Sequence, residues 1–195
     1  MAFQLKSAAF PHNGRILGVY ACDGEDVPPS LAWSGAPAGT KSFALIVDDP
    51  DAPGGTFCHW AIFDIGPTTV SLDDGIPTGA HETVNDFDRM DYGGPCPPPG
   101  PPHHYRFRLL ALDIARLNVR PHAKCQDVQR AAESHMLAKQ GSWGRMPARC
   151  TPTRRPVYLV TASFYGTLTA SLPQRNSRPS LCASSLEPNS HSTKT

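Results

Sequence analysis

The sequence predicts a fold built mainly from short β-strands. Proline accounts for 21 of the 195 residues, about 11% and roughly twice the usual share. Proline breaks helix interiors and lacks the N–H that a strand ladder needs. The apolar runs are short and bounded by proline and glycine, and a single stretch has the period of an amphipathic helix. A mostly helical fold is therefore not expected.

Three strands are predicted before residue 114. Residues 42–48 form an apolar run between glycine and proline, and residues 57–65 form a second run. In residues 105–113, apolar side chains alternate with arginines, which is typical of a strand with two different faces. The segment 66–104 between the second and third strands is rich in glycine and proline and predicts a long loop.

One helix is predicted, over residues 124–140. Its apolar side chains recur with a 3.6-residue period, and Gly141 follows as a stop signal. Beyond it the charge changes sign, since residues 1–145 carry 12 basic and 16 acidic side chains and residues 146–195 carry six and one. The change predicts a domain over 1–146 and an extension over 147–195.

The extension is predicted to be largely disordered. Residues 171–195 are rich in serine and hold no aromatic residue, a composition that buries too little apolar surface to fold. Residues 157–169 are compatible with a strand or hairpin.

Composition argues against several functional classes. The net charge of +1 argues against a dedicated nucleic-acid-binding protein. The longest apolar run, Phe43 to Val47, is far below the ~20 residues of a membrane helix, and no signal peptide opens the chain. We expect no integral membrane segment and a cytoplasmic location. The six cysteines include no Cys-x-x-Cys pair, so they are predicted to be reduced thiols rather than disulfides or zinc ligands.

Polar side chains with chemical potential gather at three places. Asp48 to Asp51 form a turn with three carboxylates, His59 lies inside the second predicted strand, and His103-His104-Tyr105 open the third. Because neighbouring strands can bring such groups together, these residues predict a pocket. Alternation in an extended strand places His103 and Tyr105 on one side and His104 on the other.

Other interpretations of these residues stay open. Asp49 and Asp51 are compatible with Asx-turns that cap the loop, and His59 with a core histidine that satisfies one hydrogen bond. Two histidines and an aspartate can hold a metal, although their spacing is unspecific. The sequence contains no Gly-x-Ser-x-Gly, P-loop, Gly-x-Gly-x-x-Gly or His-Glu-x-x-His motif.

Taken in order, the motifs resemble the phosphatidylethanolamine-binding protein family, and most closely its bacterial Raf-kinase-inhibitor-like branch. The likeness spans roughly residues 3–145 and is carried by these stretches: Cys22-Asp23-Gly24-Glu25-Asp26-Val27-Pro28-Pro29, Asp48-Asp49-Pro50-Asp51-Ala52-Pro53, His59-Trp60, Asn85-Asp86-Phe87, Tyr92-Gly93-Gly94-Pro95-Cys96-Pro97-Pro98-Pro99-Gly100, His103-His104-Tyr105 and Gly141-Ser142-Trp143-Gly144-Arg145. Asp88 and Asp91 stand where the family usually has glycine, which predicts a different loop path before Tyr92.

The resemblance implies a mainly β fold, with a large antiparallel sheet packed on a smaller one and a few peripheral helices. It also implies a pocket for phosphate, phosphoethanolamine or carboxylate groups. The family's pocket residues fall on Asp49, Asp51, His59, Pro97, Pro98, His103 and Tyr105.

The chemistry of these residue types agrees with an anion pocket. Imidazole N–H groups and the Tyr105 hydroxyl would serve as donors, and Asp49 would fix an imidazole tautomer. The prolines would form a stiff wall.

The functional hypothesis is therefore a small-anion or lipid-head-group binding protein without a cofactor, which regulates a kinase or another partner protein. Two alternatives remain. One is a metal-assisted hydrolase that uses His59, His103 and Asp49. The other is an interaction module that uses the Pro-x-x-Pro arrangements of residues 95–102.

Overall fold

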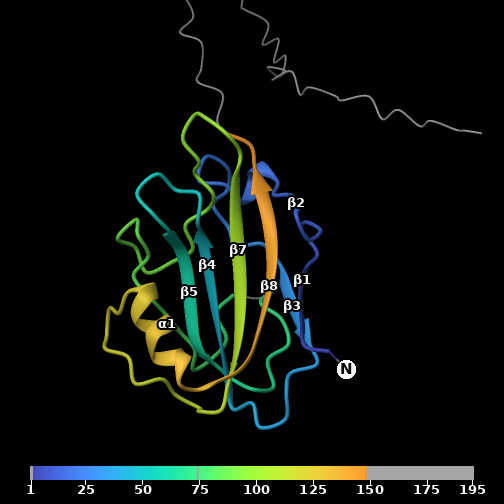
Figure 1. The fold of residues 1–195 in the computed structure, drawn as a ribbon, viewed down its shortest axis with the longest axis vertical. Helices are drawn as coiled ribbons and strands as arrows, with labels where there is room; N and C mark the ends of the chain where they lie inside the picture. Colours follow the sequence, from blue (N-terminus) through green and yellow to red (C-terminus); the bar gives the residue numbers. More distant parts are fainter. Residues whose placement is uncertain (1, 74, 149–195) are drawn as a thin grey trace, which may run out of the picture. The chain divides into compact units, whose positions relative to one another are not determined.

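The computed structural model describes residues 2–73 and 75–148, which belong to the unit Met1–Arg149. The predicted strand or hairpin at 157–169 and the predicted disordered tail lie outside the described residues. Figure 1 shows a mainly β architecture with one α-helix in the described part. Its elements are β1 Gln4–Ser7, β2 Gly14–Arg15, the 3-10 helix η1 Gly18–Tyr20, β3 Leu31–Ser34, β4 Ser42–Asp49, β5 Phe57–Ile65, β6 His81–Glu82, β7 His103–Leu112, α1 Cys125–Glu133 and β8 Met136–Met146.

The strands form a large sheet and a small one, as the resemblance implied. The large sheet has the order β2-β8-β7-β4-β5-β6, and the small sheet pairs β1 with β3. All pairings are antiparallel except β2 with β8. The mainly β prediction is confirmed, and the three strands predicted first form the centre of the large sheet (Figure 1).

Apolar side chains cover both faces of this centre. One face packs against the small sheet, where the ring of Phe43 lies 5.6 Å from Trp33 and 6.2 Å from Phe3. The other face packs against α1 through residues that include Ala44, Ile46 and Val128. Strand β4 is buried along its whole length, which explains why its sequence is a continuous apolar run rather than an alternating one.

The helix predicted over 124–140 is wrong in its second half. Helix α1 ends at Glu133, and residues 136–146 form β8, which pairs with β7 from Leu112↔Met136 to His103↔Met146. The helical period of residues 125–133 is real, because Cys125, Val128 and Ala132 are its buried residues. Pairing with a distant strand outweighs local preference beyond that point. Gly141, predicted to stop the helix, lies within β8 opposite Arg108.

The loop predicted over 66–104 is confirmed except for β6 and the first two residues of β7. Its part before β7 is held by one buried side chain. Asn85 donates through Nδ2 to the carbonyl oxygens of His59 at 3.2 Å and Asp91 at 2.9 Å. Its Oδ1 accepts from the peptide N–H groups of Phe87 and Arg89, each at 3.0 Å. These four bonds use the full capacity of the amide and fix the loop against β5.

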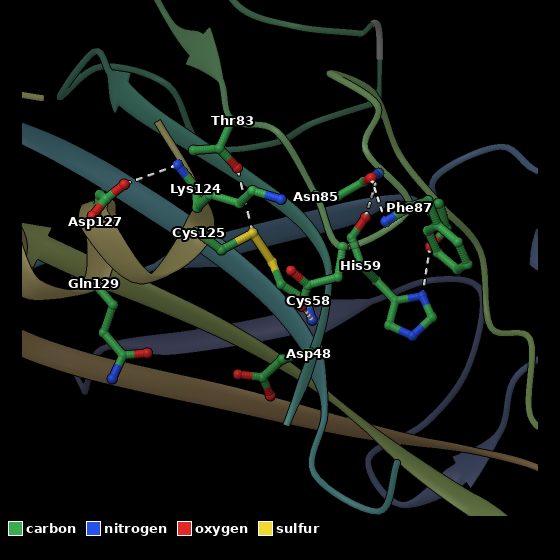
Figure 2. The surroundings of a disulfide bond; sticks show 12 residues. Asp48, Cys58, His59, Thr83, Asn85, Phe87, Lys124, Cys125, Asp127 and Gln129 are labelled. Carbon is green, nitrogen blue, oxygen red and sulfur yellow. Dashed lines mark hydrogen bonds between the residues drawn. A yellow bond between two sulfur atoms is a disulfide. The ribbon is translucent and has the colours of Figure 1, made fainter. Parts of the chain in front are cut away.

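The prediction of reduced thiols is wrong for the four cysteines in the described residues. Cys22 pairs with Cys96 and Cys58 with Cys125, with Cα–Cα distances of 5.5 and 6.4 Å. The partners are 74 and 67 residues apart, so sequence spacing carries no signal for either pairing. Figure 2 shows Cys58–Cys125 joining β5 to α1. Cys150 and Cys182 lie outside the described residues.

Candidate anion-binding site

A β-bulge places His59 on the site side of the sheet. Along the β4–β5 pairing, Val47 is opposite Trp60 and the next residue, Asp48, is opposite Cys58, which leaves His59 as the extra residue. Bulges of this kind redirect a side chain and are common beside functional sites. Cys58 therefore faces α1, while His59 and Trp60 face the other side, where the His59 ring meets Tyr105.

The imidazole of His59 is enclosed by three aromatic rings. The rings of Phe57, Phe87 and Tyr105 lie with centroids 5.1, 5.3 and 5.1 Å away, and the residue is 3% exposed. Figure 2 shows His59 beside Phe87, with Asn85 close by. Burial lowers the pKa of His59, since the charged ring loses its hydration, and the carbonyl of Gly93 and the charge of Asp49 oppose this only in part.

The tautomer of His59 follows from its hydrogen bond. Nδ1 lies 2.7 Å from the carbonyl oxygen of Gly93, and a carbonyl oxygen only accepts, so Nδ1 carries the hydrogen. In the neutral ring, Nε2 then carries a lone pair and accepts a hydrogen bond. The sequence-based expectation that both imidazoles donate N–H groups to a ligand is thus wrong for neutral His59.

His103 is oriented by a buried carboxylate. Its Nδ1 lies 2.6 Å from Oδ2 of Asp49, and both side chains are 5% exposed. The other oxygen of Asp49 accepts the peptide N–H of Asp51 at 2.8 Å. Both expected roles of Asp49, the Asx-turn and the orientation of an imidazole, are therefore present in one side chain.

Asp51 has a different partner. Its Oδ2 accepts from the peptide N–H of His104 at 2.8 Å and lies 2.7 Å from the His104 Nδ1. These side chains are 41% and 43% exposed. The hydrogen bonds from His104 lower the pKa of Asp51. The structure thus pairs Asp51 with His104 at the surface, and its direct contact with a ligand stays a prediction.

Strand β7 supplies the remaining predicted side chains. The burial of its first residues alternates, so His103 and Tyr105 are buried and His104 between them is partly exposed, as predicted. Pro97 is buried and Pro98 is exposed. The preceding residues are fixed by the Cys22–Cys96 disulfide and by the bond from the Cys22 N–H to the Pro95 carbonyl at 3.2 Å. Their role as a pocket wall stays a prediction.

The loop backbone that supports His59 was not predicted from the sequence. Gly93 and Gly94 pack so closely that a Cβ would lie 2.5 Å from the Phe87 ring at the first position and 2.3 Å from the Tyr20 carbonyl at the second. Asp26 accepts the Gly94 N–H at 2.6 Å and pairs with Arg89 at 3.0 Å. The Gly93-Gly94 pair was the available signal, because adjacent glycines often mark a close backbone approach.

Asp88 adopts a backbone conformation that glycine reaches easily and most other residues do not. Its φ is 59°, within the left-handed region that aspartate enters more readily than most residues. Its N–H bonds the Asn85 carbonyl at 3.1 Å. The different loop path expected from Asp88 and Asp91 stays a prediction.

The candidate site is identified from the arrangement of His59, His103 and Asp49 and not from the volume of a cavity, since the cavities given next are lined by other residues. Cavities of about 430 and 420 Å3 lie around residues 116–123, and one of about 390 Å3 borders Gly93, Gly94 and the Cys22–Cys96 disulfide. Within residues 2–73 and 75–148, no three His, Cys, Asp or Glu side chains are arranged to hold a metal ion. In the same part of the chain, no helix is long and apolar enough to cross a bilayer.

Comparisons with known proteins agree with this architecture. A UPF0098 protein of Methanothermobacter thermautotrophicus is 45% identical over 141 residues, which cover 69% of this chain and 92% of that protein. A UPF0098 protein of Aquifex aeolicus is 43% identical over 139 residues, covering 68% and 81%. The crystal structure of Escherichia coli YbcL, described as a member of the mammalian PEBP family, superimposes with a TM-score of 0.72 at 32% identity and covers 76% of this chain and all of that one.

The family pattern covers most of the described residues. The sequence profile named phosphatidylethanolamine-binding protein matches residues 6–145. This range includes His59, His103, Asp49 and the loop that contains Gly93. The family's sequence pattern, the relatives and the structural likeness all point the same way. The chain belongs to the phosphatidylethanolamine-binding protein family.

Proposed function

We propose that this protein binds a small oxyanion, such as phosphate, phosphoethanolamine or a carboxylate, between His59 and His103. The observation that carries the proposal is the buried His103–Asp49 pair, whose imidazole is held on the same side of the sheet as the equally buried His59. Buried imidazoles with fixed tautomers are suited to a ligand that exchanges defined hydrogen bonds with them.

The orientation of His103 supports a ligand at its free edge. Asp49 occupies Nδ1, so Nε2 at the far side of the ring is the atom available to a ligand. The ring then separates the carboxylate from the bound anion and reduces their repulsion. The ring of Tyr105 contacts that of His59, and a direct bond from its hydroxyl to the ligand stays a prediction.

Phosphate titration followed by imidazole NMR tests the proposal. We expect the signals of His59 and His103 to shift together and saturate. His135, which pairs with Asp113 at 3.0 Å and is 37% exposed, serves as the internal control. Unchanged His59 and His103 signals at saturating phosphate would overturn the proposal.

The proposal is one of binding rather than catalysis. The described residues gather no three metal ligands, so the alternative of metal-assisted hydrolysis by His59, His103 and Asp49 gains no support from their geometry. Elemental analysis of the purified protein separates the two, because a stoichiometric metal would favour the hydrolase.

Regulation of a partner protein, such as a kinase, is a finer proposal for the rim of the site. Residues 98–102 are all exposed and directly precede buried His103. A partner protein that distinguishes the ligand-bound from the ligand-free form would therefore contact this rim. Replacing Pro101 and Pro102 by alanine should lower the affinity for such a partner and leave the affinity for phosphate unchanged.

The two disulfides bear on the location of the protein. Disulfides persist in oxidising compartments and are rare in the cytosol. We propose that the protein works in an oxidising compartment, in place of the cytoplasmic location expected from the sequence. Thiol alkylation of freshly lysed cells followed by mass spectrometry checks this, and free Cys58 and Cys125 would contradict it.

A further inference from the structure

The hydrogen-bonding capacity of His59 restricts the kind of anion that fits. Its Nδ1–H is donated to the Gly93 carbonyl, which is the one hydrogen bond found for this ring among the described residues. The Gly94 carbonyl also lies close enough to raise the pKa of the imidazole. A fully deprotonated anion offers only acceptor oxygens, and its approach to a lone pair on Nε2 would be repulsive. A ligand oxygen that still carries a hydrogen would instead donate to this nitrogen.

We propose that the site selects phosphate monoesters and inorganic phosphate over phosphodiesters and sulfate, because the ligand donates its own P–O–H hydrogen to Nε2 of His59. This inference rests on the proposed anion-binding function and narrows its ligand class. It separates the soluble phosphoethanolamine monoester from the intact lipid, whose phosphate is a diester without a hydrogen to donate.

The surroundings of His59 keep its ring neutral. The charges of two β4 carboxylates, Asp48 and Asp49, oppose this by favouring a charged ring, but their effect is smaller than that of burial. Both are already engaged, Asp48 by Arg106 and Arg108 and Asp49 by His103.

The other groups packed on His59 add no further charge. They are the ring of Phe57 on β5, the ring of Tyr105 on β7, and the ring of Phe87 with the carbonyls of Gly93 and Gly94 on the loop. Burial is the largest influence and lowers the pKa of this imidazole. A ring that is neutral near pH 7 accepts at Nε2 and does not donate.

The ionisation of the ligand completes the selection. Phosphate monoesters lose their second proton near pH 6, so a sizeable fraction still carries a P–O–H group at neutral pH. Sulfate and phosphodiesters carry none at that pH, and simple carboxylic acids are almost fully ionised. The protonated ligand keeps a negative charge on its other oxygens, which remain available to donors of the site.

Calorimetric titration at pH 6.5 tests this inference with four probes. These are inorganic phosphate, phosphoethanolamine, sulfate and glycerophosphoethanolamine, and vesicles of phosphatidylethanolamine test the intact lipid. We expect the first two to bind at least about tenfold more tightly than sulfate and the diester, and the vesicles not to retain the protein. Above the second pKa of the ligand, phosphate affinity should fall about tenfold per pH unit.

A matched pair of variants assigns the selectivity to one ring. In His59→Gln, the amide can present either a donor or an acceptor, so the affinities for phosphate and sulfate should converge. His135→Gln, at the surface, should keep the wild-type ratio. If the first variant does not fold, the 15N shifts of His59 in the phosphate-bound wild type serve instead, and we expect a protonated Nδ1 with an unprotonated Nε2.

The outcomes separate the two proposals. Failure of every anion to bind would overturn anion binding itself. Sulfate binding as tightly as phosphate, or a protonated Nε2 in the phosphate complex, would overturn the selectivity and leave anion binding in place. Retention on phosphatidylethanolamine vesicles with weak phosphoethanolamine binding would assign the site to the lipid.

Discussion

Replacing Asp49 by asparagine should reverse the tautomer of His103. In the wild type, Oδ1 of Asp49 accepts the Asp51 N–H at 2.8 Å and Oδ2 lies 2.6 Å from His103 Nδ1. An asparagine that keeps the first bond must place its Nδ2 amide group toward His103. Because that group only donates, Nδ1 of neutral His103 becomes the acceptor and its hydrogen moves to Nε2.

The size of the effect follows from the burial of the pair. Removing the acceptor of a buried hydrogen bond typically destabilises a protein by about 1–3 kcal/mol, because the donor is left unsatisfied. Asp49→Ala removes the acceptor of both His103 Nδ1–H and the Asp51 N–H, so it should lower the free energy of unfolding by about 2–3 kcal/mol. Asp49→Asn keeps both hydrogen bonds in altered form and should lower it by no more than about 1–2 kcal/mol.

Two measurements check this reasoning. Urea denaturation gives the free energy of unfolding of each variant, and 15N-resolved imidazole NMR reports which nitrogen of His103 is protonated. The Asp49→Asn variant should show protonated Nε2 at His103 and an unchanged tautomer at His59, which serves as the control. If His103 keeps its hydrogen on Nδ1 in that variant, or if Asp49→Ala costs less than about 1 kcal/mol, Asp49 does not orient this ring.

Three further predictions concern the supports of the site. Joint replacement of Cys58 and Cys125 by alanine should lower the free energy of unfolding by about 4 kcal/mol, from the entropy of closing a loop between residues 67 apart. Denaturation of the variant and the wild type without reductant, which keeps the Cys22–Cys96 bridge in both, checks this. A loss below about 1 kcal/mol would contradict it. Gly93→Ala places a methyl group 2.5 Å from the Phe87 ring, so either this ring, which contacts His59, or the peptide that bonds His59 must shift. Phosphate affinity, measured by calorimetry, should drop by at least about tenfold. Gly54→Ala, at an open position, is the control. Burial lowers the pKa of His59 in the folded protein, so the unfolded chain, whose histidine has a pKa of 6.5, binds more protons as the pH falls through that value. The free energy of unfolding should therefore be highest above pH 6.5 and decrease as the pH falls toward the pKa of the folded state. Urea midpoints between pH 4.5 and 8 test the direction of this change, and their dependence on pH should be weaker in His59→Gln.

The sequence was sufficient for the strands whose signals are local. The apolar run of β4 and the alternation in β7 gave bounds within two residues of the observed strands. Strand β8 was missed because its side chains are mixed and its stability comes from pairing along β7. Its segment directly follows a true helix, so the helical prediction simply extended too far.

The candidate site divides in the same way. His59, His103 and Asp49 could be named from the family resemblance, and the face shared by His103 and Tyr105 followed from alternation alone. The bulge at His59 could not be predicted, because it depends on how β5 registers against β4. The disulfides were equally out of reach, since their partners meet only after the sheet and α1 have assembled.

The residues that decide the chemistry of His59 are therefore not those that carry the motif. A histidine can donate or accept at Nε2, and here a carbonyl, that of Gly93, selects between the two. That carbonyl is held by the contact of Gly93 with Phe87, by the bond of Gly94 to Asp26, and by the Asn85 network that anchors the same loop. In a family member whose peptide at this position turned its N–H toward the ring, Nδ1 of the histidine would accept that hydrogen bond and Nε2 would carry the hydrogen. Such a site would favour fully ionised anions. Ligand class in such proteins should accordingly follow the conformation of the glycine loop more closely than the presence of the two imidazoles.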